Sequence, residues 1–144
     1  MWNEIITQSD IDNLMKKYGH FHDSCVKEMK YLSGAFVDPD LSMYALSDKR
    51  ILKILIQRQY REPTTIELEF SGLIKLSLPP YGDGLSSELF EAVMFIEDEI
   101  IYWGDSYWFT DKRSEYDGTW VSAKKARWRI ADQYIGNEEV YITR

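Results

Sequence analysis

Three consecutive segments between residues 51 and 78 alternate apolar and polar side chains, and this alternation constrains the fold more than any other feature of the chain. Side chains on a β-strand point to opposite faces in turn, so a period of two predicts strands with one apolar face. Short connections at 62–64 and at Ser71-Gly72 favour an antiparallel meander with one buried and one solvated face. The residues expected on the buried face are Leu52, Ile54, Ile56, Tyr60, Ile66, Leu68, Phe70, Ile74, Leu76 and Leu78.

Residues 9–18 have the different period of an amphipathic helix. Ser9 is expected to cap the first turn, with Asp12 completing an S-x-x-D capping box, and Gly19 is expected to end the helix in a left-handed conformation. The apolar stripe that must pack on another element consists of Ile11, Leu14, Met15 and Tyr18.

The remaining elements are also predicted to be mainly strands. Residues 24–32, 106–110, 126–130 and 139–143 have strand composition, and a strand is favoured over a helix near residue 88. A short hairpin connection is expected at residues 97–99. The sequence therefore predicts an α+β fold, in which an N-terminal amphipathic helix packs on a twisted, mainly antiparallel sheet of about seven or eight strands.

Length and composition indicate one domain over residues 1–144. The hydrophobic fraction of 44% can supply a core, and no segment approaches the roughly 18 apolar residues of a membrane span. The N-terminus lacks the basic and apolar regions of a secretory signal, and one cysteine cannot form an internal disulfide. We therefore expect a cytoplasmic protein.

The negative charge of the chain is concentrated in residues 81–120, where ten acidic and two basic residues give a net charge of −8. Because the whole chain carries −7, the rest is nearly neutral. Such a segment repels nucleic acid and anionic lipid, so neither is expected as a partner, whereas a basic protein is favoured. The alternative reading is that this charge only maintains solubility.

The stretch GHFHDSC, residues 19–25, contains both histidines and the only cysteine. His20 and His22 lie at a spacing that can present two imidazoles to one metal, which leaves a metal-dependent enzyme as an alternative function. A catalytic zinc site usually needs a third protein ligand, and neighbouring residues on a strand face opposite ways. We therefore interpret the stretch as a helix-to-strand junction and assign no catalytic, cofactor or metal-binding residue.

Seven aromatic residues are crowded into residues 102–120. Alternation favours burial of Trp103 and Phe109, and likewise of Trp128 in the later strand, whereas at least one of Tyr107 and Trp108 is expected at the surface. Exposed aromatics in an acidic segment suit a protein interface, with a small-ligand or carbohydrate-binding module as the alternative.

We therefore predict a non-enzymatic protein-binding domain that docks a basic partner through an acidic, aromatic surface. The expected partner-binding residues are Glu97, Asp98, Glu99, Asp105, Tyr107, Trp108, Asp111 and Tyr116. A homo-oligomer is also possible if the strand expected at 139–143 lies at a sheet edge.

Three short motifs are spread along the chain: Phe21-His22-Asp23-Ser24, Phe70-Ser71-Gly72-Leu73, and Trp128-Arg129. In these motifs the chain resembles a loose group of small uncharacterised bacterial domains with an FHDS-type first strand. Some proteins of this kind look like immunity proteins, which neutralise a toxin. The resemblance implies a binding role and assigns no site residue.

Overall fold

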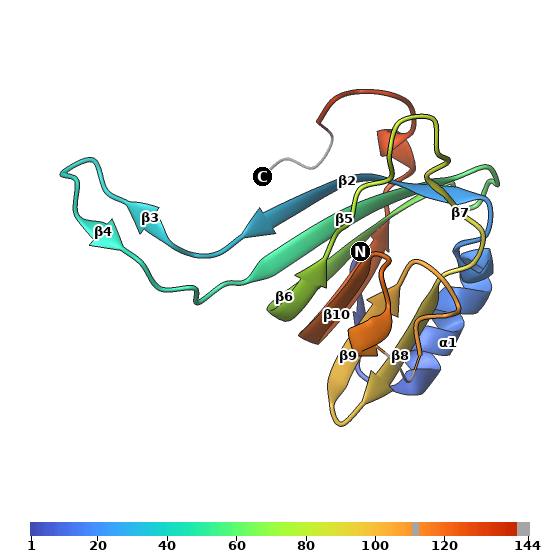
Figure 1. The fold of residues 1–144 in the computed structure, drawn as a ribbon, viewed down its shortest axis with the longest axis horizontal. Helices are drawn as coiled ribbons and strands as arrows, with labels where there is room; N and C mark the ends of the chain where they lie inside the picture. The colour runs from blue at the N-terminus through green and yellow to red at the C-terminus, as the bar shows by residue number, and fades with distance from the viewer. Residues whose placement is uncertain (111–112, 141–144) are drawn as a thin grey trace.

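The computed structural model describes residues 1–110 and 113–140. Its main sheet is antiparallel and curls into a half-barrel (Figure 1), with the strand order β7-β2-β5-β6-β10-β9-β8. The short strand β1 pairs with residues 126–128 of β10, on the same side of β10 as β9, which pairs with residues 120–123. The strands are β1 (Asn3–Ile5), β2 (Ser24–Leu32), β5 (Ile51–Arg58), β6 (Thr65–Ser77), β7 (Glu88–Leu89), β8 (Val93–Glu97), β9 (Ile100–Gly104) and β10 (Trp120–Ile130). The α+β class and the antiparallel sheet are confirmed.

The α-helix of the described residues, α1 (Gln8–Lys17), is capped two residues earlier than predicted. Thr7 is the N-cap: its hydroxyl accepts a hydrogen bond from the Asp10 backbone at 3.3 Å, and the Asp10 carboxylate accepts the Thr7 N–H at 2.9 Å. The prediction of a cap at Ser9 is therefore wrong, because a second capping box lies just upstream. The predicted left-handed Gly19 is confirmed by its φ of 59°.

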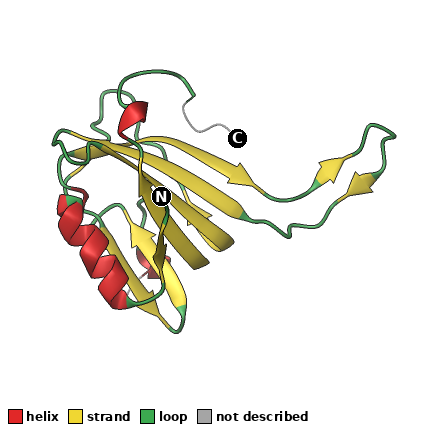
Figure 2. Ribbon diagram, turned by 180° about the vertical axis from the view of Figure 1, so that it is seen from behind, coloured by secondary structure: helices red, strands yellow, loops and turns green. Residues whose placement is uncertain are grey.

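The helix lies against one end of the curled sheet (Figure 2). Its predicted apolar stripe is buried in a core that also contains Phe21 and Trp103. The Tyr18 hydroxyl donates to the backbone oxygens of Ile56 and Thr64, both at 2.9 Å, which ties the end of the helix to the sheet. A 3-10 turn, η1 (Gly19–Phe21), then leads to β2, so the prediction of a helix-to-strand junction is confirmed. None of the described helices is long and apolar enough to cross a membrane.

One long strand, β6, replaces the two strands predicted at 65–70 and 73–78. The expected turn at Ser71-Gly72 is wrong, because Gly72 adopts a φ of 61° without breaking the pairing with β10. A register shift leaves Ile74 as an extra residue between the partners of Ser122 and Ala123. Such a bulge changes which side chains face the core. Ile74, which was expected inside, is therefore exposed. Leu78, also expected inside, follows the last residue of β6 and is exposed as well.

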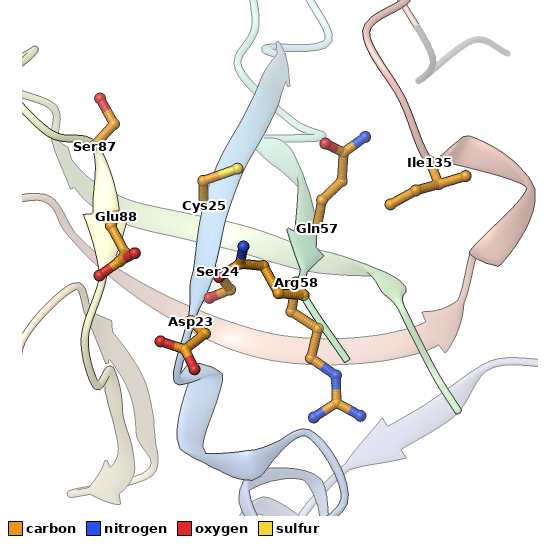
Figure 3. A pocket seen from close by; sticks show the side chains of 9 residues that line it. Asp23, Ser24, Cys25, Gln57, Arg58, Ser87, Glu88 and Ile135 are labelled. Carbon is orange, nitrogen blue, oxygen red and sulfur yellow. The ribbon is translucent and has the colours of Figure 1, made fainter. Parts of the chain in front are cut away.

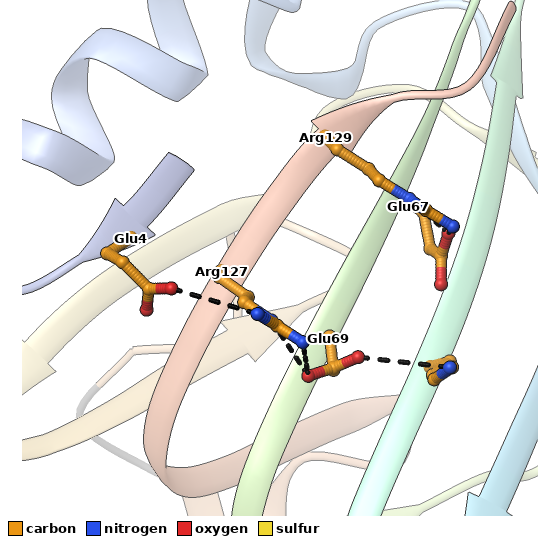
Figure 4. A network of polar contacts seen from close by, with 6 residues as sticks. Glu4, Glu67, Glu69, Arg127 and Arg129 are labelled. Carbon is orange, nitrogen blue, oxygen red and sulfur yellow. Dashed lines mark hydrogen bonds and ion pairs between the residues drawn. The ribbon is translucent and has the colours of Figure 1, made fainter. Parts of the chain in front are cut away.

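The outer face of the meander is not the solvated face that alternation predicts. Glu67 and Glu69 are 1% and 8% exposed, and two arginines of β10 cover them (Figure 4). The Arg129 guanidinium contacts one Glu67 oxygen at 2.7 and 2.8 Å, and Arg127 contacts Glu69 at 2.9 Å. The Trp2 ring lies over both guanidinium groups, at 4.3 Å from that of Arg127 and 4.5 Å from that of Arg129. This polar layer depends on partners about 60 residues apart in the sequence.

Between β2 and β5 the chain leaves the main sheet as a projecting arm, residues 33–50, which the sequence did not predict (Figures 1 and 2). Its strands β3 (Phe36–Val37) and β4 (Met43–Tyr44) pair only with each other. The arm adds no side chain to the buried core. It is held by its own hydrogen bonds and, at its base, by Arg50, whose backbone oxygen accepts the Leu73 N–H at 3.0 Å.

The predicted hairpin at residues 97–99 is confirmed, with Asp98 and Glu99 at φ 51° and 65° between β8 and β9. The short strand near residue 88 is β7. The strand predicted at 106–110 is wrong, because these residues form a turn. Of the strand predicted at 139–143, residues 139–140 are not in a strand, and residues 141–143 lie outside the described part of the chain.

Candidate functional site

The loop that follows β9 is fixed by one buried aromatic side chain. Phe109 is fully buried, as predicted, and lies against the rings of Trp120 and Tyr116 at centroid distances of 5.2 and 5.4 Å. It also covers Gly104, where any Cβ atom would collide with the Phe109 ring. The burial predicted for Trp103 and Trp128 is likewise confirmed.

This anchor leaves the two preceding aromatics outside. Tyr107 is 54% exposed and Trp108 is 71% exposed, with ring centroids 4.7 Å apart. Ser106 holds the turn: its hydroxyl accepts the Trp108 N–H at 3.3 Å, and its backbone oxygen accepts the Phe109 N–H at 3.0 Å. Large apolar side chains held outward by a fixed turn are typical anchors of protein interfaces.

Trp108 borders a groove of about 430 Å³ between two loops. The segment from Pro79 to Leu85 forms one wall, and residues 105–106, 108 and 116–118 line the other. Tyr81 and Leu85 are 52% and 67% exposed there, and Asp117 adds a carboxylate. A second hollow, of about 320 Å³, lies beside Tyr107 and is lined by Asp12, His20 and Glu91. We refer to Tyr81, Leu85, Tyr107, Trp108, Asp12, Glu91 and Asp117 as the loop surface.

Asp105 and Tyr116, both predicted to bind a partner, line the same groove and also support the loop from within. Asp105 is 9% exposed, and its carboxylate accepts hydrogen bonds from the Tyr116 hydroxyl and, at 3.1 Å, from the Thr119 backbone. Burial, followed by the hydrogen bond to Asp105, raises the pKa of Tyr116 well above its usual value. Burial and the same carboxylate also raise the pKa of Tyr81.

Three of the other predicted acids, Glu97, Asp98 and Glu99, do not line this groove. Glu97, Asp98 and Glu99 lie at the turn of the β8–β9 hairpin, whereas the loop starts from Gly104 at its open end. Four residue steps separate these ends, about 13 Å along a strand. Glu97 is also paired with Arg113 at 2.8 Å, and the Arg113 guanidinium lies over the Tyr102 ring at 4.4 Å. Asp111 lies outside the described residues.

A hollow of about 410 Å³ opens beside Cys25 and brings together Asp23, Ser24, Arg58 and Glu88 (Figure 3). The Ser24 hydroxyl donates to the Phe21 backbone oxygen, and burial raises the pKa of the Cys25 thiol. Both groups therefore lack the activation that nucleophilic catalysis requires.

The two histidines occupy the junction without converging. His22 contacts the Asp23 carboxylate at 3.1 Å, and His20 lines the hollow beside Tyr107. Within residues 1–110 and 113–140, no three His, Cys, Asp or Glu side chains are grouped closely enough to hold a metal ion. This geometry gives no support to a metal-dependent enzyme.

The residues of the loop surface that the sequence did not predict are Tyr81, Leu85, Asp12, Glu91 and Asp117. The turn composition YGDGLSS predicts a surface loop there, but not that the loop lies opposite Trp108. Comparisons with protein-family models, with curated proteins and with solved structures found no match.

Proposed function

We propose that this chain is a non-enzymatic protein-binding domain and that the loop surface docks a basic protein. The observation that carries the proposal is the exposure of Trp108 beside an acid-lined groove, on a turn that the buried Phe109 fixes. A fixed aromatic loses little conformational entropy on binding, so most of its buried area contributes to affinity.

Charge supports the choice of a basic partner. Asp117 lies in the groove beside Trp108, and Asp12 and Glu91 flank Tyr107. All three are exposed, and the surrounding segment 81–120 carries a net charge of −8. Such a field speeds the encounter with a cationic surface and is screened by salt.

A carbohydrate-binding role fits less well. Sugar platforms offer open ring faces, whereas the rings of Tyr107 and Trp108 lie 4.7 Å apart at 32° and partly cover each other. The narrower form of the proposal is an immunity-like role in the cytoplasm, in which the basic partner is a toxin. The free Cys25 suits a reducing compartment.

The experiment is affinity capture from the native host with three immobilised baits: wild type, Trp108→Ala and Ile74→Ala. Ile74 is 51% exposed on the bulged part of β6 and serves as the matched control. A basic protein should bind wild type and Ile74→Ala, and its purified form should bind Trp108→Ala about 30-fold more weakly, the equivalent of a loss of about 2 kcal/mol. Equal affinity of all three baits for that protein would contradict the proposal.

A further inference from the structure

The groove beside Trp108 adjoins a smaller hollow of about 250 Å³. The two share four lining residues, Pro79, Pro80, Tyr81 and Asp105, so a partner that occupies the groove also lies at the entrance of the hollow. The volume of the hollow is below the roughly 300–1,000 Å³ of sites that hold drug-sized ligands. Its size is suited to one inserted side chain.

The hollow has an exposed rim and a buried floor. Leu78 and Tyr81 at the rim are 53% and 52% exposed. Leu89, Asp105 and Thr119 at the floor are at most 9% exposed. A side chain that enters from the rim therefore leaves water as it approaches Asp105.

The charged group at the floor is the Asp105 carboxylate. One of its oxygens accepts the Tyr116 hydroxyl, and the other accepts the Thr119 N–H at 3.1 Å. Burial, followed by the charge of Asp105, raises the pKa of Tyr81, which indicates that the Tyr81 hydroxyl also lies close to this carboxylate. Because a carboxylate can accept about four hydrogen bonds, it has capacity for a further donor.

This carboxylate has no counter-charge in the described structure. No lysine, arginine or histidine side chain of residues 1–110 and 113–140 forms an ion pair with Asp105. Opposite charges attract more strongly in a poorly hydrated site than in water. Since the carboxylate is already buried in the free protein, only the entering cation has to lose its hydration.

We propose that this hollow receives a lysine side chain of the basic protein that docks on the loop surface, with the lysine ammonium group donating to the Asp105 carboxylate. The inference rests on the proposed function, because the adjoining groove is where that protein is expected to bind. Both Asp105 oxygens already accept a hydrogen bond, which hinders the bidentate contact that arginine favours. The lysine ammonium group is a compact charge and needs no such geometry.

The apolar walls of the hollow suit the stem of a lysine side chain. Val26 and Met29 of β2 pack against the core, and Leu89 of β7 belongs to it. Lysine packs its four methylene groups along apolar surface while its ammonium group keeps polar partners. The hollow offers both parts of this arrangement, with apolar contacts along the walls and one carboxylate at the floor.

Titration of the isotope-labelled full chain, followed by nuclear magnetic resonance, tests the proposal. The probe is N-acetyl-lysine N-methylamide, and its control is N-acetyl-norleucine N-methylamide, which keeps the stem and lacks the ammonium group. The reporter is the Thr119 amide, which donates to Asp105. The lysine probe should shift this amide and bind at least about tenfold more tightly than the norleucine probe, as expected for one hydrogen bond between charged groups.

Two variants locate the binding. Asp105→Asn should abolish the preference for the lysine probe over the norleucine probe. Leu78→Trp should weaken the binding of both probes severalfold, because a larger ring narrows the rim, whereas Ile74→Trp on the exposed part of β6 should leave binding unchanged. Since Leu78 lies at the surface, the Leu78→Trp variant decides the test if Asp105→Asn does not fold.

Equal affinity for the two probes would overturn the proposal, as would a preference for lysine that persists in Asp105→Asn. Binding of pentylammonium without binding of the lysine probe would also overturn it, because the hollow would then admit a free amine but no residue of a protein chain. The titration uses no partner protein. Its failure would leave the proposed function to the capture experiment with Trp108→Ala, and a failed capture with a bound lysine probe would count against that function alone.

Discussion

Replacing Arg129 with alanine is expected to destabilise the protein far more than its position near the surface suggests. The Glu67 side chain is 2% exposed, and the Arg129 guanidinium contacts its Oε2 atom at 2.7 and 2.8 Å. The other oxygen, Oε1, is buried without a hydrogen bond in the described structure. Removing Arg129 therefore leaves a buried carboxylate with no compensating charge.

The size of the expected stability loss in Arg129→Ala follows from the burial of Glu67. Breaking a buried ion pair from one side costs about 3–5 kcal/mol. For a chain of this size, each kcal/mol lowers Tm by about 2–4 °C, so the loss is about 6–20 °C. Arg127→Ala is the matched control, because Glu69 keeps Lys53 at 3.9 Å. Its expected cost is about 1.5–3 kcal/mol, the range for a hydrogen bond to a charged group.

Urea unfolding followed by circular dichroism measures both variants. The double variant Glu67→Leu/Arg129→Met removes both charges at similar volume and should return to within about 1 kcal/mol of wild type. The reasoning is refuted if Arg129→Ala costs no more than Arg127→Ala, or if the double variant is as unstable as the single one.

Three further predictions concern the loops and the junction. Gly104→Ala should push the Phe109 ring out of its site and cost about 1–3 kcal/mol in urea unfolding; unchanged stability would contradict the anchoring role of Phe109. Because the folded-state pKa of Tyr116 is raised, its contribution to stability should be complete below about pH 10 and be lost as pH rises further. The variant Tyr116→Phe should reduce this alkaline loss, and an unchanged loss would contradict the reasoning. Iodoacetamide should alkylate Cys25 in the native protein several-fold more slowly than in urea at pH 7.5, and equal rates would show that the thiol is not protected.

The elements that the sequence predicted well are those determined by local pattern. The stripe from Ile11 to Tyr18 defines the helix face, and β2 has the predicted limits, Ser24 and Leu32. The helix start was misplaced because both Thr7 and Ser9 precede an aspartate by three residues, and the sequence alone does not rank two equivalent capping boxes.

The features that the sequence did not predict depend on contacts between residues that are far apart in the sequence. The alternating pattern predicted that Glu67 and Glu69 are exposed to solvent. The sequence around them does not indicate that Arg129 and Arg127 pair with them. The aromatic run at 106–110 has strand composition, but burial of Phe109 over Gly104 folds it into a turn. For the candidate site, composition correctly suggested exposed aromatics among acids, but the opposing wall at Tyr81 and Leu85 arises only from the fold.

The most direct test of the proposed binding role is photo-crosslinking from the loop surface in the native host. A photoreactive phenylalanine analogue would replace Trp108 in one sample and Ile74 in the other. A basic protein crosslinked from position 108 but not from position 74, with a yield that falls as salt rises, is the predicted result. Crosslinking of the same proteins from both positions, or a product from position 108 that is acidic and insensitive to salt, would contradict the proposal.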